Sequence, residues 1–148
     1  MEINGLPLHP LVVHAAVVLG PLAALAALAY LVPAWRDRMR WPMLLLALVA
    51  TGAIWAAYLT GEDFLDSARF EGLSGPALEL VEDHEELADT LRLVVSGFGA
   101  VALLAALVHR RGGAVRVLLS VLLLVAAVAV GVWTVLTGEA GAQAVWGG

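Results

Sequence analysis

The stretch from Pro10 to Val32, PLVVHAAVVLGPLAALAALAYLV, decides the fold class. It contains no Asp, Glu, Lys or Arg, and it exceeds the roughly 20 residues that a helix needs to cross a hydrocarbon core about 30 Å thick. Three further apolar blocks of similar length follow, at 42–59, 89–108 and 115–136. Because backbone polar groups in lipid must be satisfied within their own segment, these blocks are predicted helices. We therefore predict an all-α integral membrane four-helix bundle, a single transmembrane domain over residues 1–148.

The composition agrees with this class. The chain is 61% hydrophobic and only 14% charged, whereas ordinary globular domains are about 45–50% apolar and about 25% charged. It has no cysteine, which excludes disulfides and thiolate metal sites held by this chain. The basic residues are all arginine and form no tract suited to nucleic acid, so nucleic acid is not a predicted partner. The long apolar blocks predict the lipid bilayer as partner. The first block lacks a basic n-region and is too long for a cleaved signal peptide, so we expect it to be retained.

Arginine is unevenly distributed along the chain. The segments WRDRMRW (35–41) and HRRGGAVR (109–116) follow the first and third blocks, so both lie on the same side of a four-span protein. Together they hold all the arginines except Arg69 and Arg92, and every acidic residue except Asp37 lies on the other side. By the positive-inside rule, we predict a multi-pass protein of the inner (cytoplasmic) membrane with both termini outside the cytoplasm. His109, beside the second arginine cluster, is expected to be a solvated helix end.

Proline and glycine suggest where the helices begin and end. Pro10 and Pro42 suit the first turn of a helix, and Pro76 predicts that the third helix starts well before the membrane. Gly112 and Gly113 predict a tight turn before the last span.

The sequence also contains a repeat. Leu-Thr-Gly-Glu occurs at Leu59–Glu62 and again at Leu136–Glu139. Thr60 follows His9 by 51 residues, and Thr137 follows His84 by 53. We predict two pseudo-repeated helix pairs related by an axis along the membrane normal. The glycine of each motif permits a left-handed cap that would end its helix at the outer surface.

Three histidines map to the outer side of the membrane: His9, His14 and His84. Histidines from facing helices of a bundle can ligate a b-type haem, and we predict His14 and His84 as the axial pair, with His9 as a substitute for either. A five-residue gap puts His9 and His14 about 140° apart on a helix, and Pro10 biases His9 away from helical geometry. This spacing argues against a metal site on one helix. Arg92, one turn from Asp89, would neutralise a haem propionate.

Two other hypotheses stay open. A copper or zinc site would use His9, His14 and His84, completed by Glu62 or Glu139. Alternatively, the histidines are interfacial polar residues of a cofactor-free accessory or structural subunit. No nucleophile–base pair or phosphate loop is present, so the sequence favours a non-catalytic electron-transfer or accessory protein over a hydrolase or kinase.

Three stretches, GLPLHPLVVH (5–14), DHEELAD (83–89) and LTGEAGAQAVWG (136–147), together resemble the bacterial membrane-protein family of domain of unknown function 2231. The resemblance implies a four-helix membrane protein without an established activity. Some members of that family are joined to Rieske-type iron–sulfur domains, so the resemblance also implies electron transfer near the outer face. Besides the lipid bilayer, we predict a larger redox membrane complex or a second copy of the chain, in a homodimer, as partner. The family positions on this chain are His9, His14, Thr60, Gly61, His84, Thr137 and Gly138. The chain departs from the family pattern at Ala15-Ala16, where members have proline, and at 139–142, where they have paired glycines.

Overall fold

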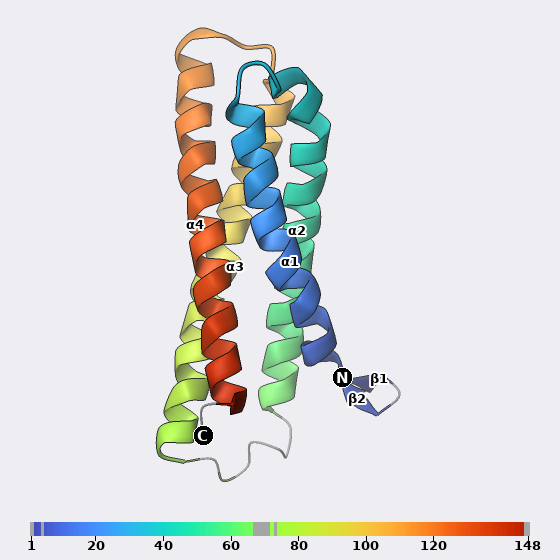
Figure 1. The fold of residues 1–148 in the computed structure, drawn as a ribbon, viewed down its shortest axis with the longest axis vertical. Coiled ribbons are helices and arrows are strands. Elements are labelled where there is room, and N and C mark those ends of the chain that lie inside the picture. Colours follow the sequence, from blue (N-terminus) through green and yellow to red (C-terminus); the bar gives the residue numbers. More distant parts are fainter. Residues whose placement is uncertain (1, 4, 67–71, 73, 147–148) are drawn as a thin grey trace.

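The fold is a bundle of four long helices. The computed structural model describes residues 2–3, 5–66, 72 and 74–146. Helices α1 (Leu8–Leu31), α2 (Arg36–Leu65), α3 (Pro76–Leu107) and α4 (Gly113–Trp146) run alternately up and down (Figure 1). Two short strands, β1 (Glu2–Ile3) and β2 (Leu6–Pro7), pair antiparallel before α1, with Ile3 opposite Leu6. All four helices are long and apolar enough to cross a membrane, which confirms the predicted fold class.

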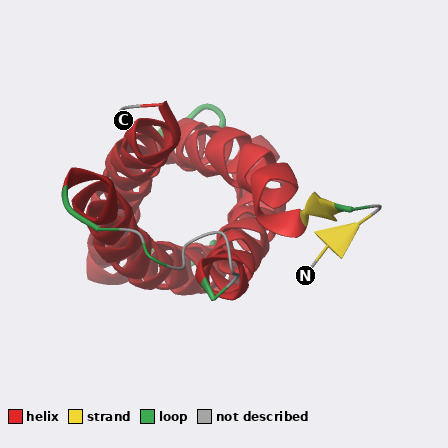
Figure 2. Ribbon diagram, turned by 90° about the horizontal axis from the view of Figure 1, so that it is seen from below, coloured by secondary structure: helices red, strands yellow, loops and turns green. Residues whose placement is uncertain are grey.

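The helices form a ring in chain order. Packing is most extensive between α1 and α2 and between α3 and α4, and the α1–α4 and α2–α3 contacts close the ring. Figure 2 shows this arrangement along the bundle axis. The two closely packed pairs are the helix pairs that the repeat predicts.

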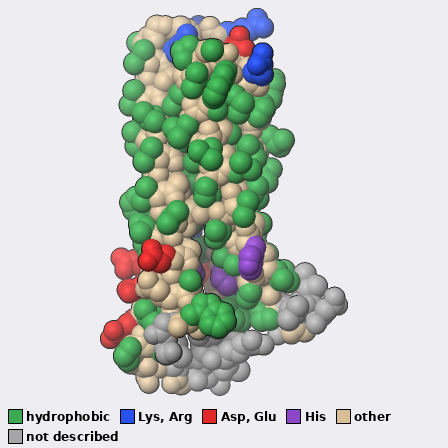
Figure 3. Space-filling view, viewed as in Figure 1, with side chains coloured by type: hydrophobic (Ala, Val, Ile, Leu, Met, Phe, Trp, Pro, Cys, Tyr) green, Lys and Arg blue, Asp and Glu red, His purple; other side chains and the backbone are tan. Residues whose placement is uncertain are grey.

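The two ends of the bundle differ in charge. Both termini lie at one end, and the α1–α2 and α3–α4 connections lie at the other (Figure 1). Arginine side chains gather at the end that carries the connections, whereas acidic side chains gather mainly at the end that carries the termini (Figure 3). We call these the arginine end and the terminal end. Arg69, which the sequence assigns to the terminal side, lies outside the described residues.

Small side chains allow the helices to approach closely. On α1 the buried residues include Ala16, Gly20, Ala23, Ala27 and Tyr30, which are three or four positions apart and therefore share one face. The face of α1 that carries these residues therefore packs against the other helices and points into the bundle. The core also holds a few large side chains, among them Met43, Phe98 and Leu123.

The contacts between the two helix pairs repeat. A Cβ on Gly20 of α1 would lie 2.7 Å from the hydroxyl oxygen of Thr134 on α4. A Cβ on Gly99 of α3 would lie 2.8 Å from the hydroxyl oxygen of Thr51 on α2. Each pair therefore presents a glycine on its first helix to a threonine on the second helix of the other pair, although the two contacts do not lie at equivalent positions of the repeat.

Three predicted helix boundaries are wrong: the start of α2 and the ends of α2 and α4. Helix α2 begins at Arg36, so Pro42 lies inside it rather than in its first turn. The Leu-Thr-Gly-Glu motifs do not end their helices, because α2 continues to Leu65 and α4 to Trp146, and neither Gly61 nor Gly138 has a positive φ. The motifs are followed by residues that sustain a helix, and one interior glycine costs only about 1 kcal/mol. The predictions at Pro10, Pro76 and Gly113 are confirmed.

A polar cluster holds three helices together at the arginine end. The Tyr30 hydroxyl donates to the carbonyl of Ala105 over 3.1 Å and lies 3.0 Å from Nδ1 of His109. Nε2 of His109 lies 2.7 Å from a carboxylate oxygen of Asp37, and the His109 side chain is only 9% exposed. His109 is thus not a solvated helix end as predicted. It contacts a buried tyrosine on α1 and an exposed acid on α2.

Candidate functional site: a pair of facing histidines

His9 and His84 face each other across the bundle near its terminal end. His9 lies on α1 and His84 on α3, which stand at opposite corners of the ring. Their ring centroids are 6.5 Å apart and the ring planes are inclined by 67°. Figure 3 shows histidine side chains in and beside a hollow of the surface in this part of the molecule.

Each imidazole is anchored to the second helix of its own pair. Nδ1 of His9 lies 2.9 Å from the carbonyl oxygen of Ala57, and Nδ1 of His84 lies 3.0 Å from that of Thr137. A carbonyl oxygen can only accept, so each Nδ1 carries the hydrogen. In a neutral imidazole, Nε2 then holds a lone pair. Within the described part of the chain, no hydrogen bond reaches either Nε2.

A glycine lies against each ring. A Cβ on Gly61 would lie 3.1 Å from Cε1 of His9, and one on Gly141 would lie 2.9 Å from Cε1 of His84. Both glycines lie four residues after the residue whose carbonyl accepts the histidine. The spatial repeat therefore matches Gly61 with Gly141, whereas the aligned motifs match Gly61 with Gly138. Gly138 instead faces Val17 of α1, 3.6 Å from where its Cβ would be.

The buried stripes of α1 and α3 explain why these two histidines meet. His9 precedes the buried Ala16 by seven residues, and His84 precedes the buried Leu91 by seven. Seven residues are almost two full turns, so each histidine shares the inward face of its helix.

The predicted pairing of His14 with His84 is not what the structure brings together. His14 stands two residues from Ala16, about 200° around the helix, and its side chain is exposed. Its Nδ1 lies 2.6 Å from the carbonyl oxygen of Pro10 in its own helix. We predicted His9 only as a substitute for one of these two ligands, but it is His9 that faces His84. Pro10 does not turn His9 away, because α1 already begins at Leu8.

The acids predicted to complete a metal site point elsewhere. Glu62 is exposed and accepts a hydrogen bond of 2.8 Å from the Tyr58 hydroxyl, and Glu139 lies 3.4 Å from the amide nitrogen of Gln143. In the ranges that the structure describes, no three His, Asp or Glu side chains come together as a metal site would need. The five-residue set of His9, His14, His84, Glu62 and Glu139 is therefore not assembled.

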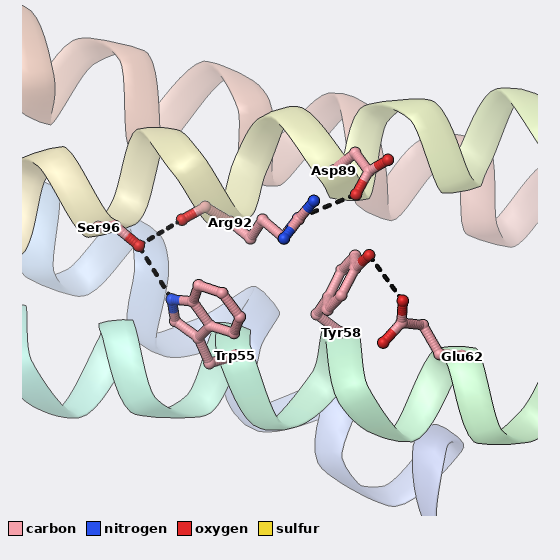
Figure 4. Close-up of polar contacts among 6 residues, drawn as sticks. All are labelled: Trp55, Tyr58, Glu62, Asp89, Arg92 and Ser96. Carbon is pink, nitrogen blue, oxygen red and sulfur yellow. Dashed lines mark hydrogen bonds and ion pairs between the residues drawn. The ribbon is translucent and has the colours of Figure 1, made fainter.

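Arg92 belongs to a separate network between α2 and α3 (Figure 4). Its Nε lies 2.9 Å from the carboxylate of Asp89 in the same helix, and its guanidinium carbon lies 4.6 Å from the Tyr58 ring centroid. Next to it, the Trp55 indole N–H donates to the Ser96 hydroxyl over 2.9 Å. The sequence assigned Arg92 to a haem propionate, but here its contacts are to Asp89 and to aromatic rings of α2.

The fold and this site define a class: a four-helix membrane protein with a histidine from each helix pair near one end of its bundle. The family model described as a predicted membrane protein, DUF2231, matches residues 5–148. The chain belongs to that family, as its three quoted stretches indicate. No curated protein and no solved structure matches the chain.

Proposed function

We propose that this protein is a small electron-transfer subunit of the membrane that holds a b-type haem between His9 and His84. The observation that carries the proposal is the pair of Nδ1–carbonyl hydrogen bonds. Histidines that bind metals commonly donate their second ring N–H to a carbonyl or carboxylate, which fixes the ring and makes the free nitrogen a better donor to the metal. Ala57 and Thr137 supply these carbonyls at 2.9 and 3.0 Å.

The separation of the rings would allow His9 and His84 to hold one metal-containing group between them. Each ligating nitrogen lies about 2.0–2.1 Å from its metal and about 1 Å from its own ring centre, so two rings on opposite sides of one metal have centres roughly 6 Å apart. The observed separation is 6.5 Å. The distance between the ring centres is therefore close to the one that a shared metal would require.

The number of protein ligands favours haem over a bare ion. Zinc sites take three or four protein ligands, whereas a porphyrin supplies four nitrogens itself and needs only axial ligands from the chain. His9 and His84 offer two, and no third candidate accompanies them in the described ranges. Bound haem would supply reversible one-electron chemistry. The chain's own part is to hold both imidazoles in one tautomer and one orientation.

The test is the absorption spectrum of the full chain, purified in detergent from cells supplied with a haem precursor and recorded before and after dithionite. We expect a Soret band and sharpened α and β bands on reduction, which His9→Ala and His84→Ala each abolish. His14→Ala is the matched control, because it removes an exposed histidine from the same helix, and it should leave the spectrum unchanged. A protein that stays colourless with haem supplied would overturn the proposal and favour the cofactor-free accessory subunit.

We also propose that the terminal end, with the histidine pair, lies outside the cytoplasm. The arginine end carries six arginines in its two connections and flanking turns, and such clusters are retained in the cytoplasm. Alkaline phosphatase fused after Trp146 should be active in cells, and the same enzyme fused in the Gly112–Gly113 turn should be inactive. The opposite pattern would place the histidine pair on the cytoplasmic side.

A further inference from the structure

Two buried hydroxyls of α4, three residues apart, have no hydrogen-bond partner in the described chain. They belong to Thr134, which is 2% exposed, and Thr137, which is 8% exposed. The hydroxyls of Thr51, Thr60 and Ser96, in contrast, each donate to the carbonyl four residues earlier, over 2.7–2.8 Å. That local bond is available to any threonine or serine inside a helix. Thr134 and Thr137 depart from this pattern.

The two hydroxyls lie on one side of α4. Residues three apart in a helix are neighbours on the same face. Thr134 faces α1 at Gly20, where an added Cβ would lie 2.7 Å from the hydroxyl oxygen. Thr137 provides the carbonyl that anchors His84 of α3. Because both side chains are also buried, the side of α4 that carries them looks into the bundle, and at Thr137 this helix also contacts His84.

We propose that Thr134 and Thr137 donate hydrogen bonds to an oxygen acceptor held inside the bundle next to His84. A buried hydroxyl without a partner is costly, so a pair of them on one inward face indicates a polar group that both contact. Two sources would supply such an oxygen: an internal water molecule, or a carboxylate of the porphyrin, in which case the inference rests on the proposed function.

The first test needs no cofactor. Thr134→Val and Thr137→Val keep the shape of the side chain and remove the hydroxyl, and Thr51→Val serves as control because its hydroxyl is bonded within the protein. If water bridges the two hydroxyls, each of these two variants should melt about 2–4 °C below the wild type. Thr51→Val should melt lower by a similar amount in any case, because it loses a hydrogen bond within the protein. If the hydroxyls have no partner at all, removing them should raise the melting temperature instead.

The second test separates the two sources. Iron protoporphyrin IX carries two carboxylates, and iron octaethylporphyrin carries none. A carboxylate acceptor predicts that Thr137→Val weakens binding of the first about two- to tenfold and leaves binding of the second unchanged. A water acceptor predicts a lower melting temperature without haem and equal effects on both porphyrins. A raised melting temperature with unchanged binding of both would overturn the inference. If the wild type binds neither porphyrin, the proposed function fails, and the melting test still decides for or against bound water.

Discussion

Substitution of Gly141 by alanine should move the His84 ring. The new Cβ would lie 2.9 Å from Cε1 and 3.1 Å from Nδ1 of that ring, whereas ordinary contact begins at 3.4 Å. The ring must therefore retreat by about 0.5 Å, which lengthens the 3.0 Å contact of Nδ1 with the Thr137 carbonyl towards the limit of a hydrogen bond. We expect the free energy of unfolding to fall by about 1–2 kcal/mol, because an overpacked site and a weakened hydrogen bond both destabilise the folded state by amounts of this order.

Gly131→Ala is the matched control on the same helix, because a Cβ there meets nothing within 4 Å. It should leave stability unchanged or raise it by about 0.5–1 kcal/mol, since alanine is the better helix former. Thermal unfolding in detergent, followed by helical circular dichroism, compares the two variants, and the Soret absorbance per protein reports haem retention. Equal melting temperatures and equal haem content in the two variants would refute the placement of His84 against Gly141.

Two further predictions concern packing away from the histidines. Gly99→Ala places a Cβ 2.8 Å from the Thr51 hydroxyl oxygen, so it should lower the free energy of unfolding by about 1–3 kcal/mol. The control Gly97→Ala has open space around the new Cβ and should not lower it. Identical melting curves for the two variants would contradict the close α2–α3 contact. Tyr30→Phe removes the bond to the Ala105 carbonyl and should cost about 1 kcal/mol in a chemical-denaturant titration, and an unchanged midpoint would show that this bond does not stabilise the arginine end.

The fold was predictable because hydropathy and arginine placement are properties of whole segments. Four apolar blocks require four helices in lipid whatever their detailed packing. Helix ends were less predictable, since the glycines at 61 and 138 are compatible with both a cap and an interior position. Only contacts with the neighbouring helices, such as that of Gly61 with His9, show which position each glycine occupies.

To choose between His9 and His14 from the sequence, one must know which face of α1 points into the bundle. The signal was present in the sequence, because the small residues at 16, 20, 23 and 27 mark the inward face, and His9 lies on it. The same rule places Glu62, two residues after the buried Thr60, on the outward face. The carbonyls that anchor the histidines could not be predicted, because their positions depend on how far one helix is displaced along another.

The location of the histidine pair at one end of the bundle has an electrical consequence. His9 precedes Leu31, the last residue of α1, by 22 residues, or about 33 Å along the helix axis. The core of the described helices between them is built mainly of alanine, valine and other apolar side chains. If the proposed haem is held by this pair and its redox partners dock at the terminal end, electrons would enter and leave on the same side of the membrane. Since moving one charge across the bilayer involves about 2.3 kcal/mol per 100 mV, the reaction would be electrically silent and would neither consume nor build the membrane potential.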